Sequence, residues 1–103
     1  MEALKGYQKK FLKGLAHGLK PVVYIGQKGL TANLVDAIQD ALETHELIKV
    51  KFVEFKDRPQ KVSLAETLAV EANCQLVGII GHIAILFRQQ TDPEKCNIQL
   101  PQR

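Results

Sequence analysis

Four consecutive residues, Gly26-Gln27-Lys28-Gly29, form the segment of this chain that is best suited to bind an anion. They stand between a short apolar run and the start of a helical pattern. A loop that leads into a helix N-terminus presents unpaired backbone N–H groups, and the helix dipole adds positive charge, so phosphate is favoured there. The two glycines let a phosphate approach the backbone, Lys28 adds a full charge, and Gln27 can donate hydrogen bonds.

The same tetrapeptide has a structural alternative, because glycines between a strand and a helix are often turn formers. It lacks the Gly-Lys-Ser/Thr ending of a P-loop and the spacing of a dinucleotide-binding fingerprint, so neither kind of nucleotide site is indicated. RNA-binding domains do use a Gly-x-x-Gly loop to clamp the sugar-phosphate backbone. The charge around the loop therefore decides how much weight this interpretation carries.

Positive charge is concentrated in the first third of the chain. The net charge is +3, but residues 1–30 carry six lysines and one acidic residue, whereas residues 31–103 carry eight basic and ten acidic residues. This asymmetry points to an anionic partner, although a solvated lysine face explains it equally well. The candidate phosphate contacts outside the loop are Thr31, Lys5, Lys9, Lys10, Lys13, Lys20, Lys56, Arg58 and Arg88. The last three have an alternative role as ordinary surface charges, and Arg88 also as the partner of a carboxylate.

The segment before the loop is predicted to be an amphipathic helix over residues 2–17. Apolar residues recur at helical spacing at Leu4, Tyr7, Phe11 and Leu15. Lysines lie on the other side of the same helical wheel, which predicts one apolar and one cationic face. Pro21 then prevents the helix from continuing toward the loop.

A strand and a second helix are expected to hold the loop between them. Val22–Ile25 predicts a short buried strand, and Tyr24 within it is interpreted as a core residue rather than a stacking one. The second helix is expected over residues 31–45, with Thr31 as its N-cap. Its outer face carries Asp36, Asp40 and Glu43, so any nucleic-acid site should face away from it.

The next segment predicts a half-buried strand with an irregular end. Ile48, Val50 and Phe52 alternate with Lys49 and Lys51, which is the period of a strand with one face buried. Val53 and Phe55 shift this phase, so a bulge or burial on both faces is expected near them.

The remaining elements are a third helix and a hairpin. Apolar spacing predicts the helix over residues 61–73. Residues 76–80 and 83–87 read as two strands joined by a tight Gly81-His82 turn, which favours antiparallel pairing. The polar segment from Gln89 onward is expected to be a loose tail.

The element order is therefore α-β-α-β-α-β-β, which predicts a small mixed four-stranded sheet packed with three helices. Strands separated by helices imply right-handed crossovers and a parallel core, to which the final hairpin adds an antiparallel strand. A chain of 103 residues suggests one domain. We expect it to span residues 1–90, followed by a flexible polar tail over residues 91–103.

Catalytic, metal and cofactor sites are not indicated. Cys74 and Cys96 are isolated, the three histidines are scattered, and none of these residues has a partner at a metal-ligand spacing. No nucleophile stands beside a base, and no acid and base are paired. No apolar run approaches the length of a membrane span, and the lysine-rich N-terminus lacks an apolar signal core, so we expect a cytoplasmic protein. We also expect it to be a monomer.

Three segments in the same order resemble the CRM domain (chloroplast RNA splicing and ribosome maturation), and more closely its bacterial stand-alone form, the YhbY family. They are LAHGLKPVVYIGQKGLTANLV, HELIKVKF and LVGIIGHIAILFR, and the resemblance covers residues 2–90. Phe87 departs from the family, where tyrosine often precedes the arginine. The resemblance implies association with large-subunit ribosomal RNA precursors during assembly, and a fold similar to the C-terminal domain of translation initiation factor three.

Three classes of function follow from these observations. The first is a non-catalytic RNA-binding module that grips phosphates with the Gly-x-x-Gly loop and the basic N-terminal helix. The second is an adaptor that binds an acidic ribosomal or assembly protein through the lysine face. The third, an enzyme acting on a phosphorylated small molecule, lacks a catalytic constellation, so no small-molecule substrate is expected.

Overall fold

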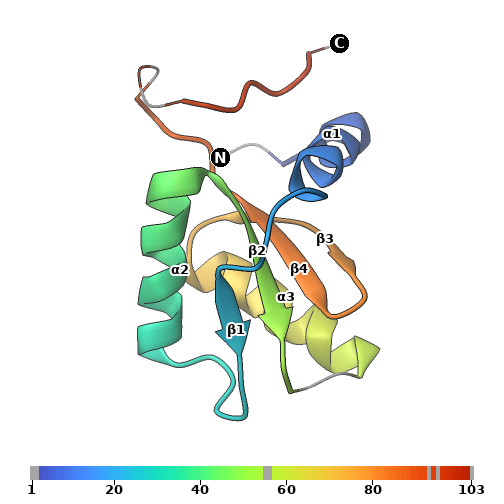
Figure 1. Ribbon diagram of the computed structural model, residues 1–103, viewed down its shortest axis with the longest axis vertical. Helices are drawn as coiled ribbons and strands as arrows, with labels where there is room; N and C mark the ends of the chain where they lie inside the picture. The colour runs from blue at the N-terminus through green and yellow to red at the C-terminus, as the bar shows by residue number, and fades with distance from the viewer. Residues whose placement is uncertain (1–2, 55–56, 93, 95, 103) are drawn as a thin grey trace.

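The helices and strands of the computed structural model follow the predicted order (Figure 1). The structure describes residues 3–54, 57–92, 94 and 96–102. Within these residues the elements are α1 (Gly6–Ala16), β1 (Val23–Ile25), α2 (Ala32–His45), β2 (Leu47–Phe52), α3 (Arg58–Glu71), β3 (Gln75–Ile80) and β4 (Ile83–Phe87). The predicted mixed four-stranded sheet packed with three helices is confirmed.

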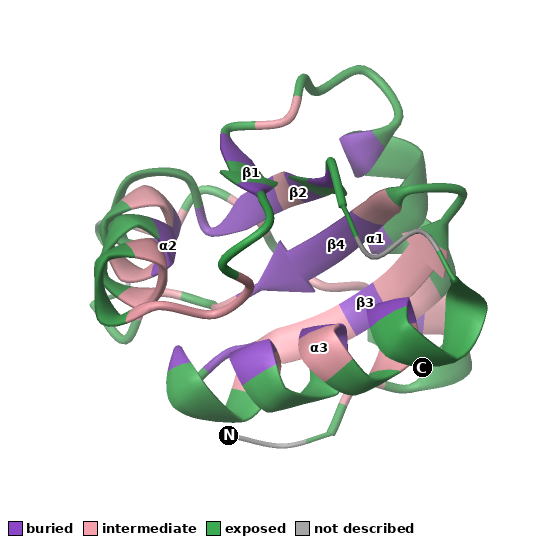
Figure 2. Ribbon diagram, turned by 90° about the horizontal axis from the view of Figure 1, so that it is seen from below, coloured by how far each residue is buried: buried purple, intermediate pink, exposed green. Residues whose placement is uncertain are grey.

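The strands form one sheet in the order β1-β2-β4-β3. β1 and β2 are parallel, and β4 pairs antiparallel with both β2 and β3. The prediction of a parallel core is wrong beyond this one pair, because β4 inserts between β2 and β3. β4 is an apolar run that is buried over most of its length, which suits a central strand, whereas β3 is less buried and takes the edge (Figure 2).

Helices cover both faces of the sheet. α2 and α3 pack on one face, where the larger core includes Ile48, Val50 and Phe52 of β2. α1 packs on the opposite face, where the smaller core consists of Leu12, Ala16, Leu47, Val77, Ile85 and Phe87. Because successive side chains of a strand point to opposite faces, the alternation seen in the sequence decides which residues of β2 meet which helices.

The set of α1 side chains that faces the sheet differs from the predicted set. Its buried residues are Gln8, Leu12 and Ala16, whereas Phe11 and Leu15 are 38% and 44% exposed. Both the predicted and the observed set recur at helical spacing, so packing against the sheet determines which set is buried. The Lys13 side chain passes over Gly78 of β3, where an added Cβ would lie 2.6 Å from Lys13 Cε. A larger residue at position 78 would therefore require the end of the Lys13 side chain to shift.

The first residues of α2 and α3 can be compared with the helix starts that the sequence predicted. Thr31 caps α2 as predicted, since its Oγ1 accepts a hydrogen bond from Leu34 N at 3.1 Å. α3 begins at Arg58, earlier than the expected residue 61, because Pro59 fits the first turn of a helix. Lys61 is consequently a buried residue inside α3, where its Nζ donates to the Gly81 carbonyl at 2.6 Å.

Near Val53, where a bulge or burial on both faces was predicted, Val53 N and Glu54 N both donate to the Ile25 carbonyl, at 2.9 and 3.4 Å, just beyond the end of β2 at Phe52. Val53 is 45% exposed, and Phe55 lies outside the described residues. A register irregularity that was not predicted lies in β3, between Leu76 and Gly78. It falls on the edge strand, where bulges are common.

The C-terminal segment is attached to the domain, in contrast to the loose tail that was predicted. Glu46, at the end of α2, is fully buried, and its carboxylate accepts hydrogen bonds from Gln90 N, Asn97 N and Ile98 N at 2.8, 2.7 and 3.0 Å. A buried carboxylate requires such donors, and the tail supplies them. Ile98 and Leu100 then pack against the smaller core.

Candidate nucleic-acid interface

The Gly26–Gly29 loop forms a tight turn at the end of β1. Gly29 N donates a hydrogen bond to the Gly26 carbonyl at 3.0 Å, and Gly29 has a φ of 69°, which lies in the left-handed region that glycine tolerates best. Gln27 and Lys28 are exposed at the tip of this turn. The turn therefore presents a cation and an amide side chain to solvent, as the sequence predicted.

The turn leads into the N-terminus of α2, where backbone donors remain. The Thr31 hydroxyl satisfies Leu34 N, which leaves the amides of Ala32 and Asn33 without an acceptor inside the helix. None of the described residues beyond its two chain neighbours has an atom within 4 Å of the position that a Cβ at Gly26 would take, and the φ of Gly26 is not in the left-handed region. The described residues thus give no steric reason for glycine at position 26, whereas the approach of a ligand to the backbone would give one.

α1 and the loop do not lie side by side, which corrects the expected juxtaposition of the two. Figure 1 shows α1 near one end of the longest axis, which measures 38 Å, and the loop between β1 and α2 at the other end. Among the α1 lysines, Lys5, Lys10 and Lys13 are exposed and Lys9 is half-buried. Lys20 is exposed in the connection to β1, which crosses back over the sheet. The loop and the helix can share one ligand only across the sheet face between them.

That part of the sheet face is uncovered and carries residues from all four strands. Tyr24 pairs with Lys51, Lys51 with Ile83, and Ile83 with Ile80. Because directly paired residues point to the same face, these four side chains form one row across the sheet. Ile83 contacts the smaller core, so the row lies on the α1 face. We call Tyr24, Lys51, Ile83 and Ile80 the open row.

The open row overturns the interpretation of Tyr24 as a core residue. Tyr24 is 56% exposed and Ile80 57% exposed, because α1 covers the sheet only toward its other end. Lys51 is also exposed, and the Lys49 Nζ donates to the Leu19 carbonyl at 3.0 Å, which holds the connection between α1 and β1. Neither of these two lysines is among the site residues predicted from the sequence. Their alternation with buried residues in LIKVKF was the signal that they share the face of Leu47.

The remaining predicted contacts fall at different ends of the molecule. Arg58, at the start of α3, is exposed, and its guanidinium donates to the Ile79 carbonyl at 3.5 Å, beside the β3 end of the open row. Lys56 lies outside the described residues. Arg88 follows β4 at the far end of the sheet, where its guanidinium donates to the Gln39 carbonyl at 3.1 Å. Its expected carboxylate partner is replaced by this backbone oxygen.

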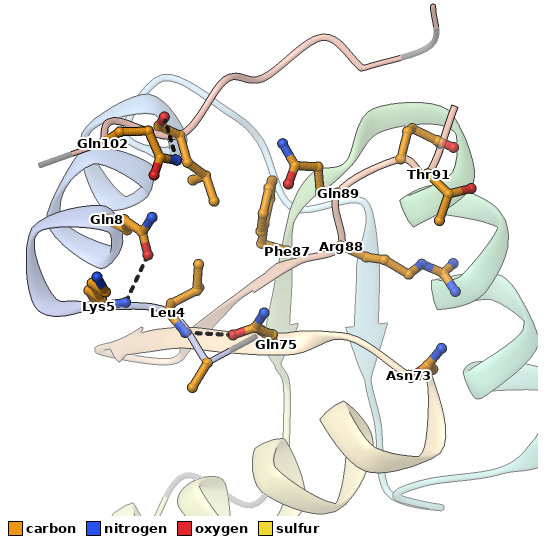
Figure 3. A pocket seen from close by; sticks show the side chains of 13 residues that line it. Leu4, Lys5, Gln8, Asn73, Gln75, Phe87, Arg88, Gln89, Thr91 and Gln102 are labelled. Carbon is orange, nitrogen blue, oxygen red and sulfur yellow. Dashed lines mark hydrogen bonds between the residues drawn. The ribbon is translucent and has the colours of Figure 1, made fainter. Parts of the chain in front are cut away.

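The structure brings Arg88 and Lys5 together at one cavity of about 580 Å³ (Figure 3). Amide side chains from α1, β3 and the C-terminal segment line it, including Gln8 and Gln75. Several of these amides are already engaged: Gln75 Oε1 accepts from Leu4 N at 2.9 Å, and Gln8 Oε1 accepts from Lys5 N at 2.9 Å. In Figure 3 the Arg88 side chain extends toward α2 rather than into the cavity. These contacts attach the N-terminal segment to the sheet.

The helical face on the other side of the sheet is acidic. Its exposed carboxylates come from α2 and α3, namely Asp36, Asp40, Glu43, Glu66 and Glu71. A groove between these two helices is lined by Asp36 and Glu71 among others. A polyanion is repelled there and attracted to the lysine-bearing α1 face, so the charge distribution orients any nucleic acid.

Side chains suited to metal binding do not gather in the described part of the chain. No three His, Cys, Asp or Glu side chains there are placed to hold a metal ion. Cys74 is buried, as expected, and burial raises the pKa of its thiol to about 11, so it stays protonated near neutral pH. None of the described helices is long and apolar enough to cross a membrane.

Residues 4–88 match the model of the CRS1 / YhbY (CRM) domain family. A protein from Haemophilus influenzae named "RNA-binding protein" is 45% identical over 103 residues, which cover both chains completely. "Probable RNA-binding protein YqeI" of Bacillus subtilis is 36% identical over 98 residues, covering 95% of this chain and 99% of the relative. The solution structure of the hypothetical protein SAV1595 from Staphylococcus aureus, described as a candidate RNA-binding protein, superposes with a TM-score of 0.81 at 35% identity, covering 96% of this chain and all of that one.

Proposed function

The chain belongs to the CRS1 / YhbY (CRM) domain family, and on that basis we propose that it is a non-catalytic RNA-binding protein. The names of two relatives support this proposal, since one is called "RNA-binding protein" and the other "Probable RNA-binding protein YqeI". The acidic face of α2 and α3 leaves the α1 face as the side that RNA approaches. The described residues give this face its cations, the backbone donors lie at the start of α2 at the end of the sheet, and the residue pattern indicates no catalytic constellation.

The observation that carries the proposal is the arrangement of the loop at the end of β1. Its turn exposes Lys28 and directs the chain into the N-terminus of α2, where the amides of Ala32 and Asn33 lack intrahelical acceptors. The full charge and the partial charge of the helix dipole act at the same place. We expect an RNA phosphate to bind there, with Gly26 allowing the close approach.

The finer part of the proposal is that the RNA is large-subunit ribosomal RNA, bound during ribosome assembly by a cytoplasmic monomer. The similarity to the YhbY form of the CRM domain supports this assignment. Crosslinking in cells, followed by sequencing of the attached RNA, tests it directly. Recovery of large-subunit precursor sequences is the expected outcome, and enrichment of unrelated RNA contradicts the assignment.

Replacing Lys28 tests the loop itself. Lys28→Gln removes one positive charge, and Ala37→Glu makes the same change in net charge at an exposed site on the acidic helical face. Binding of an unstructured RNA is measured against salt concentration, where each neutralised phosphate contributes a log–log slope of about −0.7. We expect Lys28→Gln to weaken RNA binding and to make the log–log slope shallower by the contribution of about one phosphate. Ala37→Glu should change neither the affinity nor the slope. A folded Lys28→Gln variant that binds as wild type does removes the loop from the interface.

A second candidate function, contact with another protein, is favoured by apolar side chains on and after α1. Phe11, Leu15, Leu19 and Val22 are each between 38% and 48% exposed. The last three line a shallow, mainly apolar cavity of about 470 Å³. Exposed apolar patches commonly mark protein interfaces. If an acidic ribosomal or assembly protein binds here, Leu19→Ser abolishes its co-purification while RNA binding is retained.

A further inference from the structure

The open row is a second surface near the loop that the phosphate-binding proposal does not use. Tyr24 precedes Gly26 by two residues along β1, so the row begins where the loop begins. From Tyr24 it crosses Lys51 and Ile83 and ends at Ile80 on the edge strand. The sheet is therefore open over its full width at the loop end, while α1 covers the other end.

The composition of the row is unusual for an exposed sheet surface. It combines an aromatic ring and two isoleucines with a single cation, and its two ends, Tyr24 and Ile80, are more than half exposed. Isolated apolar residues on a surface require no explanation, but this row places an exposed aromatic ring and two neighbouring isoleucines on either side of one lysine. A nucleobase is flat and apolar on its faces and is joined to a charged phosphate, so it matches both parts of the row.

The charges around the row fit the backbone of one RNA strand. Lys28 follows the end of β1 by three residues, Lys51 lies within the row, and Arg58 of α3 donates to the Ile79 carbonyl next to Ile80. The row itself contains no carboxylate, and Glu54 lies two residues beyond β2. A strand bound along the row therefore contacts Lys51 directly and has Arg58 near its β3 end and the loop with Lys28 near Tyr24, whereas its bases meet Tyr24 and the isoleucines.

An unpaired strand fits this surface better than a duplex. In an RNA duplex the faces of the bases are stacked on one another and are not available to a tyrosine ring. A sheet that presents an aromatic side chain binds bases of single strands by stacking, with little dependence on sequence. A duplex can contact the lysines through its phosphates, but it leaves Tyr24 unused.

We propose that the open row is a stacking platform for a base of single-stranded RNA, centred on Tyr24 and adjacent to the phosphate held by the Gly26–Gly29 loop. The inference rests on the proposed function, because it requires that RNA binds to the α1 face. It adds the form of RNA that is selected, an unpaired segment. Tyr24 stacks on the base, and Lys51 neutralises the neighbouring phosphate.

The test uses the full chain, an unstructured oligoadenylate and the matching A·U duplex. Tyr24 is exposed, so Tyr24→Ala leaves the core intact, which thermal unfolding verifies. We expect Tyr24→Ala to weaken oligoadenylate binding about 5- to 150-fold, the range that corresponds to about 1–3 kcal/mol for one stacked base. Tyr24→Phe keeps the ring and restores the affinity to within about twofold, and neither change affects the duplex or the salt slope.

Fluorescence supplies an independent measurement, because the chain has two tyrosines and no tryptophan. In a Tyr7→Phe background the only tyrosine is Tyr24, and we expect oligoadenylate to quench its emission. If Tyr24→Ala binds oligoadenylate as tightly as wild type, or if the emission is not quenched, the stacking platform is refuted. When Lys28→Gln still weakens binding in that case, the proposed RNA-binding function survives. If wild type binds neither RNA, the proposed function itself fails.

Discussion

The two glycines of the loop should have different roles, and alanine substitutions separate them. Gly29 adopts a φ of 69°, whereas Gly26 is not in the left-handed region, and none of the described residues beyond its chain neighbours lies within 4 Å of where its Cβ would be. An L-residue in the left-handed conformation costs about 1–2 kcal/mol. Replacing glycine by alanine also reduces the entropy of the unfolded chain, which returns about 0.4–1 kcal/mol when the native conformation is compatible. The two effects oppose each other at position 29, but only the second acts at position 26.

We therefore expect Gly29→Ala to lower the free energy of unfolding by about 1 kcal/mol, and Gly26→Ala to leave it unchanged or slightly higher. For a domain of this size, 1 kcal/mol corresponds to about 4–8 °C in the unfolding temperature. Gly29→Asn should be milder than Gly29→Ala, because asparagine tolerates the left-handed region. Thermal unfolding followed by circular dichroism measures all three variants against wild type.

The effects of the two alanine substitutions on RNA affinity should be the reverse of their effects on stability: Gly26→Ala, which does not destabilise the fold, should be the one that weakens RNA binding. Gly26→Ala places a methyl group in the space through which a phosphate approaches the backbone, so it should weaken oligoadenylate binding in a fully folded protein. Equal stability of Gly29→Ala and wild type would refute the conformational argument. Unchanged RNA binding by Gly26→Ala would show that the backbone at position 26 is not approached.

Two further predictions concern buried groups away from the interface. Glu46→Gln should reduce the free energy of unfolding, measured in urea, by about 1.5–3 kcal/mol and expose the C-terminal segment to proteases, because the buried carboxylate accepts hydrogen bonds from Gln90 N, Asn97 N and Ile98 N. Glu43→Gln, at an exposed site on α2, is the control. Equal effects of the two substitutions would contradict the role of Glu46 in attaching the C-terminal segment. Burial raises the pKa of the Cys74 thiol from 9.0 to about 11, so the native state holds this proton more tightly than the unfolded state. The associated stability is complete below pH 9 and is lost as the pH rises through about 11, with a slope of at most ~1.4 kcal/mol per pH unit that should be absent in Cys74→Ala.

Local signals in the sequence predicted most of the elements. The alternation of Ile48, Val50 and Phe52 located β2, the Gly81-His82 turn located the hairpin, and Thr31 marked the start of α2. Each signal depends on residues within a few positions of one another, so it can be read without knowing the rest of the fold. The loop belongs to the same class, because its turn closes between Gly26 and Gly29.

Features that depend on a distant partner could not be predicted in this way. Phe11 and Leu12 both lie on stripes with helical spacing, and the contact between Lys13 and Gly78 of β3 accompanies the stripe that is buried. The tail was expected to be loose because its sequence is polar. Its attachment depends on Glu46, which comes from the end of α2 and has no apparent partner in the linear sequence.

The features of the candidate site also fall into two groups, those that neighbouring residues determine and those that depend on the fold. Composition and spacing specified a cationic turn at a helix N-terminus and an excess of lysine in the first third of the chain, because these properties reside in neighbouring residues. The tertiary structure determined how these features are arranged relative to one another. By placing β4 between β2 and β3 and α1 at the far end of the sheet, it separated the lysine helix from the loop and left Tyr24, Lys51, Ile83 and Ile80 side by side on the uncovered face. These four residues come from four strands, so only the folded sheet brings them together.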